Sequence, residues 1–163
     1  AVQAAGDGLQ VKIARVFALV GAHLPLDKHF AIGNFLRAAM NGEEILIKGD
    51  GTPYRSYLYA ADMAAWLWAV LLKGEAGRAY NVGSEESLSI AALADRICGV
   101  ISRPCRVVVQ EQAPADAAPT HYVPNVSRAQ LELGLPMPLM LNEAIARTAR
   151  WHAKQVSACQ HEA

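Results

Sequence analysis

Several features that mark specialised classes of protein are missing from this sequence of 163 residues. Charge of one sign is missing, because fifteen basic residues balance fifteen acidic ones and no run of lysine and arginine offers a stripe for a polyanion. A long apolar run is missing too: the longest, residues 63 to 72, falls well short of the roughly 18 residues that indicate a membrane span. We therefore expect neither a nucleic-acid partner nor a membrane partner.

Cysteine is scarce and odd in number, with Cys98, Cys105 and Cys159. None of the three stands in a C-x-x-C pair or in a Cys/His cluster with the spacing of metal ligands. The five histidines are scattered, and none has a second histidine three or four residues later. We expect reduced thiols in a cytoplasmic protein, and no metal site.

The N-terminus lacks the features of a signal peptide, namely a positively charged start and an apolar segment, and it lacks an initiating methionine. Its first eight residues, AVQAAGDG, resemble the tail of a helix followed by a glycine turn. The sequence therefore predicts that the chain is part of a longer protein.

Strand-like and helix-like segments alternate along the chain, which is typical of the α/β class. Hydrophobic patterns and turn residues predict strands at residues 9–21, 44–48, 54–59, 79–82 and 106–109. They predict helices at residues 29–41, 63–73, 90–101, 127–133 and 142–152, with a frayed tail after residue 155.

The helix at residues 63–73 is apolar around nearly its whole circumference, so we expect both of its sides to be covered, with Trp66 and Trp68 in the core. Polar residues at the starts of three helices predict side-chain caps. They are Asp62, Ser89, and Ser127 with Gln130 in a capping box.

The stretch KGDGTPYRSYLY, residues 48 to 59, raises the possibility of a ligand loop. A phosphate loop needs its lysine after the glycines and a helix after the loop, whereas here Lys48 comes first and a strand is expected next. A calcium loop needs several oxygen ligands, whereas Asp50 stands alone. The remaining interpretation is a tight strand-to-strand turn that presents Arg55, whose guanidinium is suited to bidentate binding of a diphosphate.

Four motifs occur in order along the chain and resemble those of one family. They are R-x-F-x-x-x-G at residues 15–21, G-D-G-x-x-x-R-x-Y-x-Y-x-x-D at 49–62, Y-N-V-G-S-E-E-S-L-S-I at 80–90, and a late helix-Gly-x-Pro unit ending at 136. Together they resemble the C-terminal half of the extended short-chain dehydrogenase/reductase family, the NAD-dependent epimerases and dehydratases of nucleotide sugars.

The resemblance implies a single incomplete α/β domain, made of the C-terminal portion of a Rossmann-like parallel sheet and a small mixed α/β substrate-binding subdomain. Residues 1–21 and 79–101 would be the Rossmann-type elements, residues 22–78 and 102–155 the substrate-binding elements, and residues 156–163 a tail.

The same resemblance assigns roles to individual residues. It implies that Arg55 grips the nucleotide diphosphate and that Phe30 and Asn34 frame the base and phosphates. The residues implied to lie near the nicotinamide and the sugar are Val16, Phe17 and Ala18. Ala18 departs from the family, which often has a substrate-binding asparagine there. A partial match to the family's R-P-x-D stretch near the ribose keeps Pro114 and Asp116 but has Ala113 in place of the arginine.

The family's catalytic motifs are missing from this sequence. No G-x-x-G-x-x-G turn is present, and no tyrosine is followed four residues later by a lysine, so the proton-transferring pair of the family is absent. We therefore assign no catalytic residue, and we expect NAD(P) in a full-length enzyme but none bound by this chain alone.

Two functions follow from these observations. The first is the nucleotide-binding part of an enzyme that acts on a UDP-, dTDP-, CDP- or GDP-linked sugar through transient hydride transfer. The second is a truncated relative that serves as a non-catalytic assembly module, for which self-association, such as a homodimer, is expected. The sequence does not choose between epimerisation, dehydration, reduction and decarboxylation.

Overall fold

A computed structural model describes residues 8–101, 103–113 and 118–161 of the chain. The strands are β1 Ile13–Val16, β2 Leu19–Val20, β3 Ile45–Ile47, β4 Tyr54–Arg55, β5 Leu58–Tyr59, β6 Ala79–Val82, β7 Leu88–Ser89, β8 Val107–Val109 and β9 His121–Tyr122. The helices are α1 Ala31–Asn41, α2 Ala60–Lys73, α3 Ile90–Ile101, α4 Ser127–Leu133 and α5 Leu141–His161. The α/β class predicted from the sequence is confirmed.

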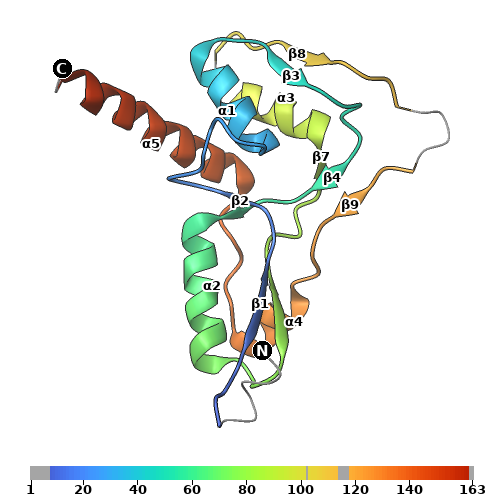
Figure 1. Ribbon diagram of the computed structural model, residues 1–163, viewed down its shortest axis with the longest axis vertical. Helices are drawn as coiled ribbons and strands as arrows, with labels where there is room; N and C mark the ends of the chain where they lie inside the picture. The colour runs from blue at the N-terminus through green and yellow to red at the C-terminus, as the bar shows by residue number, and fades with distance from the viewer. Residues whose placement is uncertain (1–7, 102, 114–117, 162–163) are drawn as a thin grey trace.

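The strands form short, separate sheets, most of them parallel. β1 pairs with β6, β2 with β5 and β3 with β8, all in parallel, while β4 pairs in antiparallel with β7 and in parallel with β9. Figure 1 shows α2, β1 and α4 in the lower half of the molecule and α1, α3 and β3 in the upper half. The strands β2 and β5 lie where the two halves meet.

Two predicted strands are wrong because each changes its partner midway. The single strand expected at residues 9–21 is two, β1 and β2: the N–H of Phe17 still donates to Val82, whereas the carbonyl of Ala18 already accepts from Leu58. The strand expected at residues 54–59 is likewise divided into β4 and β5, which lie in different sheets. An apolar sequence pattern reports burial of the chain, but it does not report which strand lies beside it.

Among the described residues, the core consists of two apolar clusters, one in each half of the molecule. The larger joins β2, α1, β3, α3 and the start of α5, with Ile32, Leu36, Ile45, Leu93 and Ile145 fully buried. The smaller joins β5, α2, β6 and α4 around Trp66 and Tyr80. The helix α2 therefore packs with β1 and β6, and α3 packs with α1 and α5.

The exposure of α2 differs from a second prediction, namely that both sides of this helix are covered. Trp66 and Val70 are buried as expected, but Trp68 is 63% exposed and Leu72 is 74% exposed, with Leu71 beside them. Only one side of α2 is thus covered within the described residues. We call Trp68, Leu71 and Leu72 the outer face of α2.

The helix ends follow the sequence in part. Ser89 caps α3 as predicted, since its hydroxyl accepts a hydrogen bond of 3.1 Å from the N–H of Ala92. The capping box at Ser127 is wrong: Ser127 is already helical, and the carboxamide oxygen of Asn125 accepts its N–H at 3.0 Å. The helix α5 also continues to His161, beyond both the predicted end at residue 152 and the frayed tail expected after residue 155.

The cysteines correct a further prediction, because Cys98 and Cys105 form a disulfide. The bond links α3 to the segment that leads into β8. Sequence spacing alone did not indicate it, because the two residues come together only when the chain turns back after α3. Among the described residues, none of the helices combines the length and the apolar character needed to cross a bilayer.

Candidate functional site

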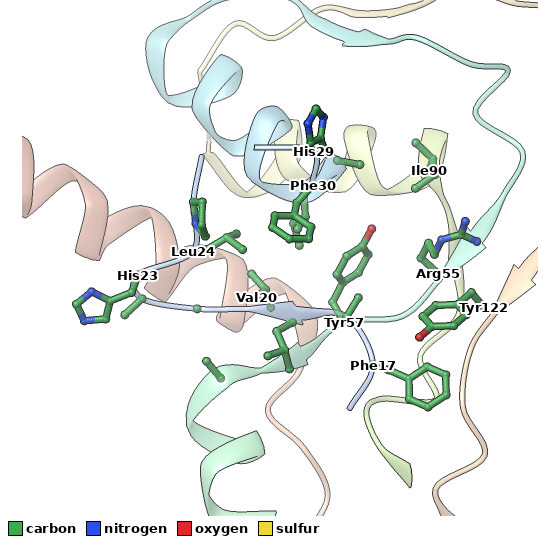
Figure 2. Close-up of a pocket in the computed structure, with 18 residues that line it drawn as sticks. Phe17, Val20, His23, Leu24, His29, Phe30, Arg55, Tyr57, Ile90 and Tyr122 are labelled. Atoms are coloured by element: carbon green, nitrogen blue, oxygen red, sulfur yellow. The ribbon is translucent and has the colours of Figure 1, made fainter. Parts of the chain in front are cut away.

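A cavity of about 650 Å³ lies between β2, the start of α1 and the segment that joins β4 to β5. Its volume falls in the range of small-molecule sites. The walls are mainly apolar, with Phe17, Val20, Leu24, Phe30 and Ile90 among the lining residues. Figure 2 shows Phe30 and Tyr57 facing its interior, with Arg55 and Tyr122 at one side and His23 at the other. We call this the main cavity.

Arg55 brings a positive charge to a wall that is otherwise apolar on its side of the main cavity. It is half-buried in β4, and its Nη1 donates a hydrogen bond of 2.8 Å to the carbonyl of Tyr54. Ion pairs were found for several arginines of the described segments, but none of those pairs includes Arg55. The guanidinium is therefore positioned to donate hydrogen bonds to an anionic group of a ligand.

The turn before Arg55 fixes its own shape. The Asp50 carboxylate accepts hydrogen bonds of 2.9 Å from the N–H and from the hydroxyl of Thr52, which closes an Asx turn. Gly51 has a φ of 75°, and a Cβ at that position would lie 3.1 Å from the Cβ of Ala91. The Asp50 carboxylate therefore binds within the turn itself. Among the residues described by the structure, no group of three or more possible metal ligands occurs.

Tyr57 places a phenol in the main cavity. Its side chain is only 7% exposed, and Figure 2 shows the hydroxyl between Phe30 and Ile90. Burial raises the pKa of Tyr57 to about 12, although the nearby Arg55 acts in the opposite direction. At neutral pH this phenol is protonated, so it can donate a hydrogen bond to a ligand but is not a base.

The residues that the sequence singled out fall in different places. Phe17, Ala18, Phe30 and Arg55 all line the main cavity, whereas Asn34 lines a second cavity of about 700 Å³. The carboxamide of Asn34 donates to the carbonyl of Lys28 at 2.9 Å.

Two of the remaining positions lie elsewhere. Val16 is not part of the lining of the main cavity, and it is 42% exposed at the end of β1. Asp116 lies outside the described residues.

Two lining residues were missed by the sequence analysis. Tyr122 comes from β9, and its ring lies 5.8 Å from the guanidinium carbon of Arg55. His23 has a positive φ of 62° and places its ring 4.4 Å from that of Trp151 in α5. Neither residue belongs to a recognisable motif, and each partner is distant in sequence, so no local signal marks them.

The sequence matches the profile of the NAD dependent epimerase/dehydratase family over residues 1–83. The chain belongs to this family. Its α/β fold agrees with that of solved members: an epimerase from Methanothermobacter thermautotrophicus superposes with a TM-score of 0.80 over 95% of this chain and 46% of that chain, at 25% identity. The UDP-glucose 4-epimerase of Thermotoga maritima, solved with UDP-glucose, gives a TM-score of 0.82 over 94% of this chain and 49% of that one, at 20% identity.

Relatives of known activity show the same partial coverage. UDP-glucuronic acid decarboxylase 6 of Arabidopsis thaliana is 28% identical over 138 residues, which cover 85% of this chain and 39% of the relative. The chain therefore spans about two-fifths of the length of this relative.

The residues that the structure describes do not form a full dinucleotide site. The sequence contains no G-x-x-G-x-x-G turn, and the main cavity is lined by one arginine and mostly apolar side chains. An apolar wall such as that of Phe17 and Ala18 suits a flat ring, but it does not bind the pyrophosphate of a dinucleotide.

Proposed function

We propose that this chain is the nucleotide-sugar-binding part of an NAD-dependent epimerase/dehydratase, and that Arg55 binds the diphosphate of the nucleotide. One observation carries the proposal: the guanidinium of Arg55, which forms no ion pair within the described residues, lies in the wall of the main cavity together with Phe17, Ala18 and Phe30. The relatives support the substrate class, because they include a decarboxylase of UDP-glucuronic acid and an epimerase of UDP-glucose.

Different lining residues would contact different parts of the nucleotide sugar. Arg55 would hold the diphosphate through its N–H donors, and Phe30 would lie against the base. Phe17 and Ala18 would form the wall toward the nicotinamide and the sugar. Ala18 offers only a methyl group there, so hydrogen bonds to the sugar must come from other side chains, such as the protonated phenol of Tyr57.

The chain would bind and orient the nucleotide sugar rather than transform it. In a complete enzyme, bound NAD would supply the transient hydride transfer that the family resemblance implies, and this chain would hold the sugar nucleotide in place for it. The proton transfer that accompanies this step needs a base near neutral pH, and Tyr57 is unsuited to that role because its pKa is raised to about 12. The expected location in the cytoplasm rests on reduced thiols, and the disulfide between Cys98 and Cys105 removes that support.

The test is binding by the isolated chain. We expect UDP and dTDP to bind weakly, uridine and thymidine to bind more weakly than either, and no UDP-sugar to be converted when NAD is supplied. Titration calorimetry gives the affinities and chromatography of the sugar nucleotides gives the turnover. Absence of binding to either diphosphate by a folded sample contradicts the proposal.

A second candidate function, a module for assembly, is favoured by the outer face of α2. Exposed apolar residues on adjoining turns of a helix mark an interface more often than a solvated surface. The edge of β1 that faces away from β6 also has no partner strand within the described residues. Free strand edges promote association. In the first function this face would pack against the remainder of the enzyme, and in the second it would pack against another copy.

The oligomeric state separates these cases. If a second copy covers the outer face of α2, the chain sediments as a dimer, and the double variant Trp68→Gln with Leu72→Glu sediments as a monomer. Val109→Glu, at an exposed apolar residue of β8, is the matched control and leaves the dimer intact. A monomeric wild-type chain that unfolds cooperatively rules out the assembly function.

A further inference from the structure

The short strand β9 places an aromatic ring against each residue of β4. In the parallel register His121 lies beside Tyr54 and Tyr122 beside Arg55. The rings of His121 and Tyr54 are stacked, with centroids 4.5 Å apart and planes inclined by 8°. The Tyr122 ring lies under the guanidinium of Arg55, at 5.8 Å from ring centroid to guanidinium carbon. β9 is thus the structural partner of the strand that carries Arg55.

Tyr122 also contacts Phe17, another residue that lines the main cavity. Its ring centroid lies 4.8 Å from that of Phe17, with the planes inclined by 34°. Figure 2 shows Tyr122 between Phe17 and Arg55, at the edge of the main cavity. The ring is 50% exposed, so it is not a core residue whose role is packing alone.

Few other contacts hold the Arg55 side chain. Within the described residues it makes one hydrogen bond, to the carbonyl of Tyr54, and no carboxylate pairs with it. A cation over an aromatic ring is attracted by the negative face of the ring, and this attraction leaves most of the N–H donors of the guanidinium free. Tyr122 can therefore restrain the guanidinium without occupying the groups that bind a ligand.

We propose that Tyr122 is a positioning residue, whose ring holds the guanidinium of Arg55 at the wall of the main cavity in readiness for the diphosphate of a nucleotide. This inference rests on the proposed function of Arg55. The aromatic face is the essential feature, and the hydroxyl is not. A phenylalanine therefore serves in place of Tyr122, and an aliphatic side chain of similar bulk does not.

Binding of UDP tests this role, with uridine as the comparison ligand. Tyr122→Leu is expected to weaken UDP binding by about threefold to fivefold, the effect of one partly exposed cation–π contact. Tyr122→Phe keeps the wild-type affinity, and uridine binding is unchanged in both variants. In an Arg55→Ala background Tyr122→Leu produces no further loss, because the ring acts through the guanidinium. If Tyr122→Leu does not fold, Tyr122→Ile replaces it.

A second measurement does not depend on nucleotide binding. The NMR signal of the Arg55 Nε–Hε group in the free chain is expected to show a ring-current shift that is kept in Tyr122→Phe and lost in Tyr122→Leu. If this shift behaves as expected but the wild-type chain binds no UDP, the proposed function fails while the restraint of Arg55 by Tyr122 stands. An absent shift, an equal loss with phenylalanine, or an equal weakening of uridine binding overturns the inference.

Discussion

The carboxylate of Asp62 accepts a hydrogen bond of 2.7 Å from the backbone N–H of Leu139, which lies 77 residues further along the chain. Asp62 is in the first turn of α2, where an acidic side chain also interacts favourably with the helix dipole. The bond ties α2, in the lower half of the molecule, to the segment that leads into α5 in the upper half. Asp62 therefore links the two halves, and it is not the helix cap that the sequence predicts, since α2 begins at Ala60.

Removing this link should lower stability. We expect Asp62→Ala to reduce the free energy of unfolding by about 2 kcal/mol, the contribution of a hydrogen bond to a charged group. Asp62→Asn should lose less, because the carboxamide oxygen can still accept the N–H of Leu139. Urea denaturation followed by circular dichroism measures both values. Asp27→Ala, at an exposed carboxylate in a loop, serves as the control, and an equal loss in the control would remove Asp62 from this role.

Gly33 lies inside α1, and we expect its replacement by alanine to change stability in the direction opposite to the one that helix propensity predicts. Replacing glycine by alanine in a helix usually stabilises it by about 1 kcal/mol, but a Cβ at Gly33 would lie 2.5 Å from the carbonyl oxygen of Pro25. We expect Gly33→Ala to destabilise the chain by about 1 to 2 kcal/mol, because the loop before α1 must move.

The matched control for this prediction is Gly99→Ala in α3. A Cβ at Gly99 meets no described atom within 4 Å, so the usual stabilisation of about 0.5 to 1 kcal/mol is expected there. Thermal unfolding of the two variants compares them directly. A Gly33→Ala variant as stable as Gly99→Ala would show that the loop does not approach α1 so closely.

The contact between His23 and α5 predicts that the stability of the chain depends on pH. Burial lowers the pKa of His152 below its ordinary value of 6.5, and the neighbouring His23 lowers it further, while a hydrogen bond to the backbone of Leu24 acts in the opposite direction. The folded chain therefore binds fewer protons than the unfolded chain, so the free energy of unfolding should fall as the pH drops below 6.5.

Guanidinium denaturation between pH 8 and pH 5 measures this effect. We expect the loss of stability at low pH to become smaller in His152→Gln and to persist in His29→Gln, where an exposed histidine is removed. A His152→Gln variant with the wild-type pH profile would show that His152 does not cause the dependence.

The sequence predicted the class of the fold and part of the site, for reasons that these residues make clear. Arg55, Phe17 and Phe30 belong to motifs with fixed spacing, so the resemblance could place them, and all three line one cavity. Tyr122 and His23 act through partners that only the folded chain brings near. The roles of Asp62 and Gly33 likewise depend on Leu139 and Pro25, which no local pattern connects to them.

The predicted strands failed for a related reason. The apolar stretch at residues 9–21 was expected to be one covered strand, but only Val20 and Gly21 within it are buried. Its backbone passes from Val82 to Leu58 as hydrogen-bond partner at Phe17 and Ala18. The disulfide between Cys98 and Cys105 and the exposed outer face of α2 also depend on how elements pack rather than on local pattern.

The central claim, that Arg55 binds a nucleotide diphosphate, is tested most directly by calorimetric titration of UDP into the wild-type chain, Arg55→Ala and Arg150→Ala. Arg150 is an exposed arginine of α5 that does not line the main cavity, so its replacement removes the same charge without changing the cavity wall. We predict that Arg55→Ala weakens UDP binding by about 1.5 to 3 kcal/mol, while Arg150→Ala binds UDP as the wild type does. Equal affinity of all three chains for UDP would contradict the account.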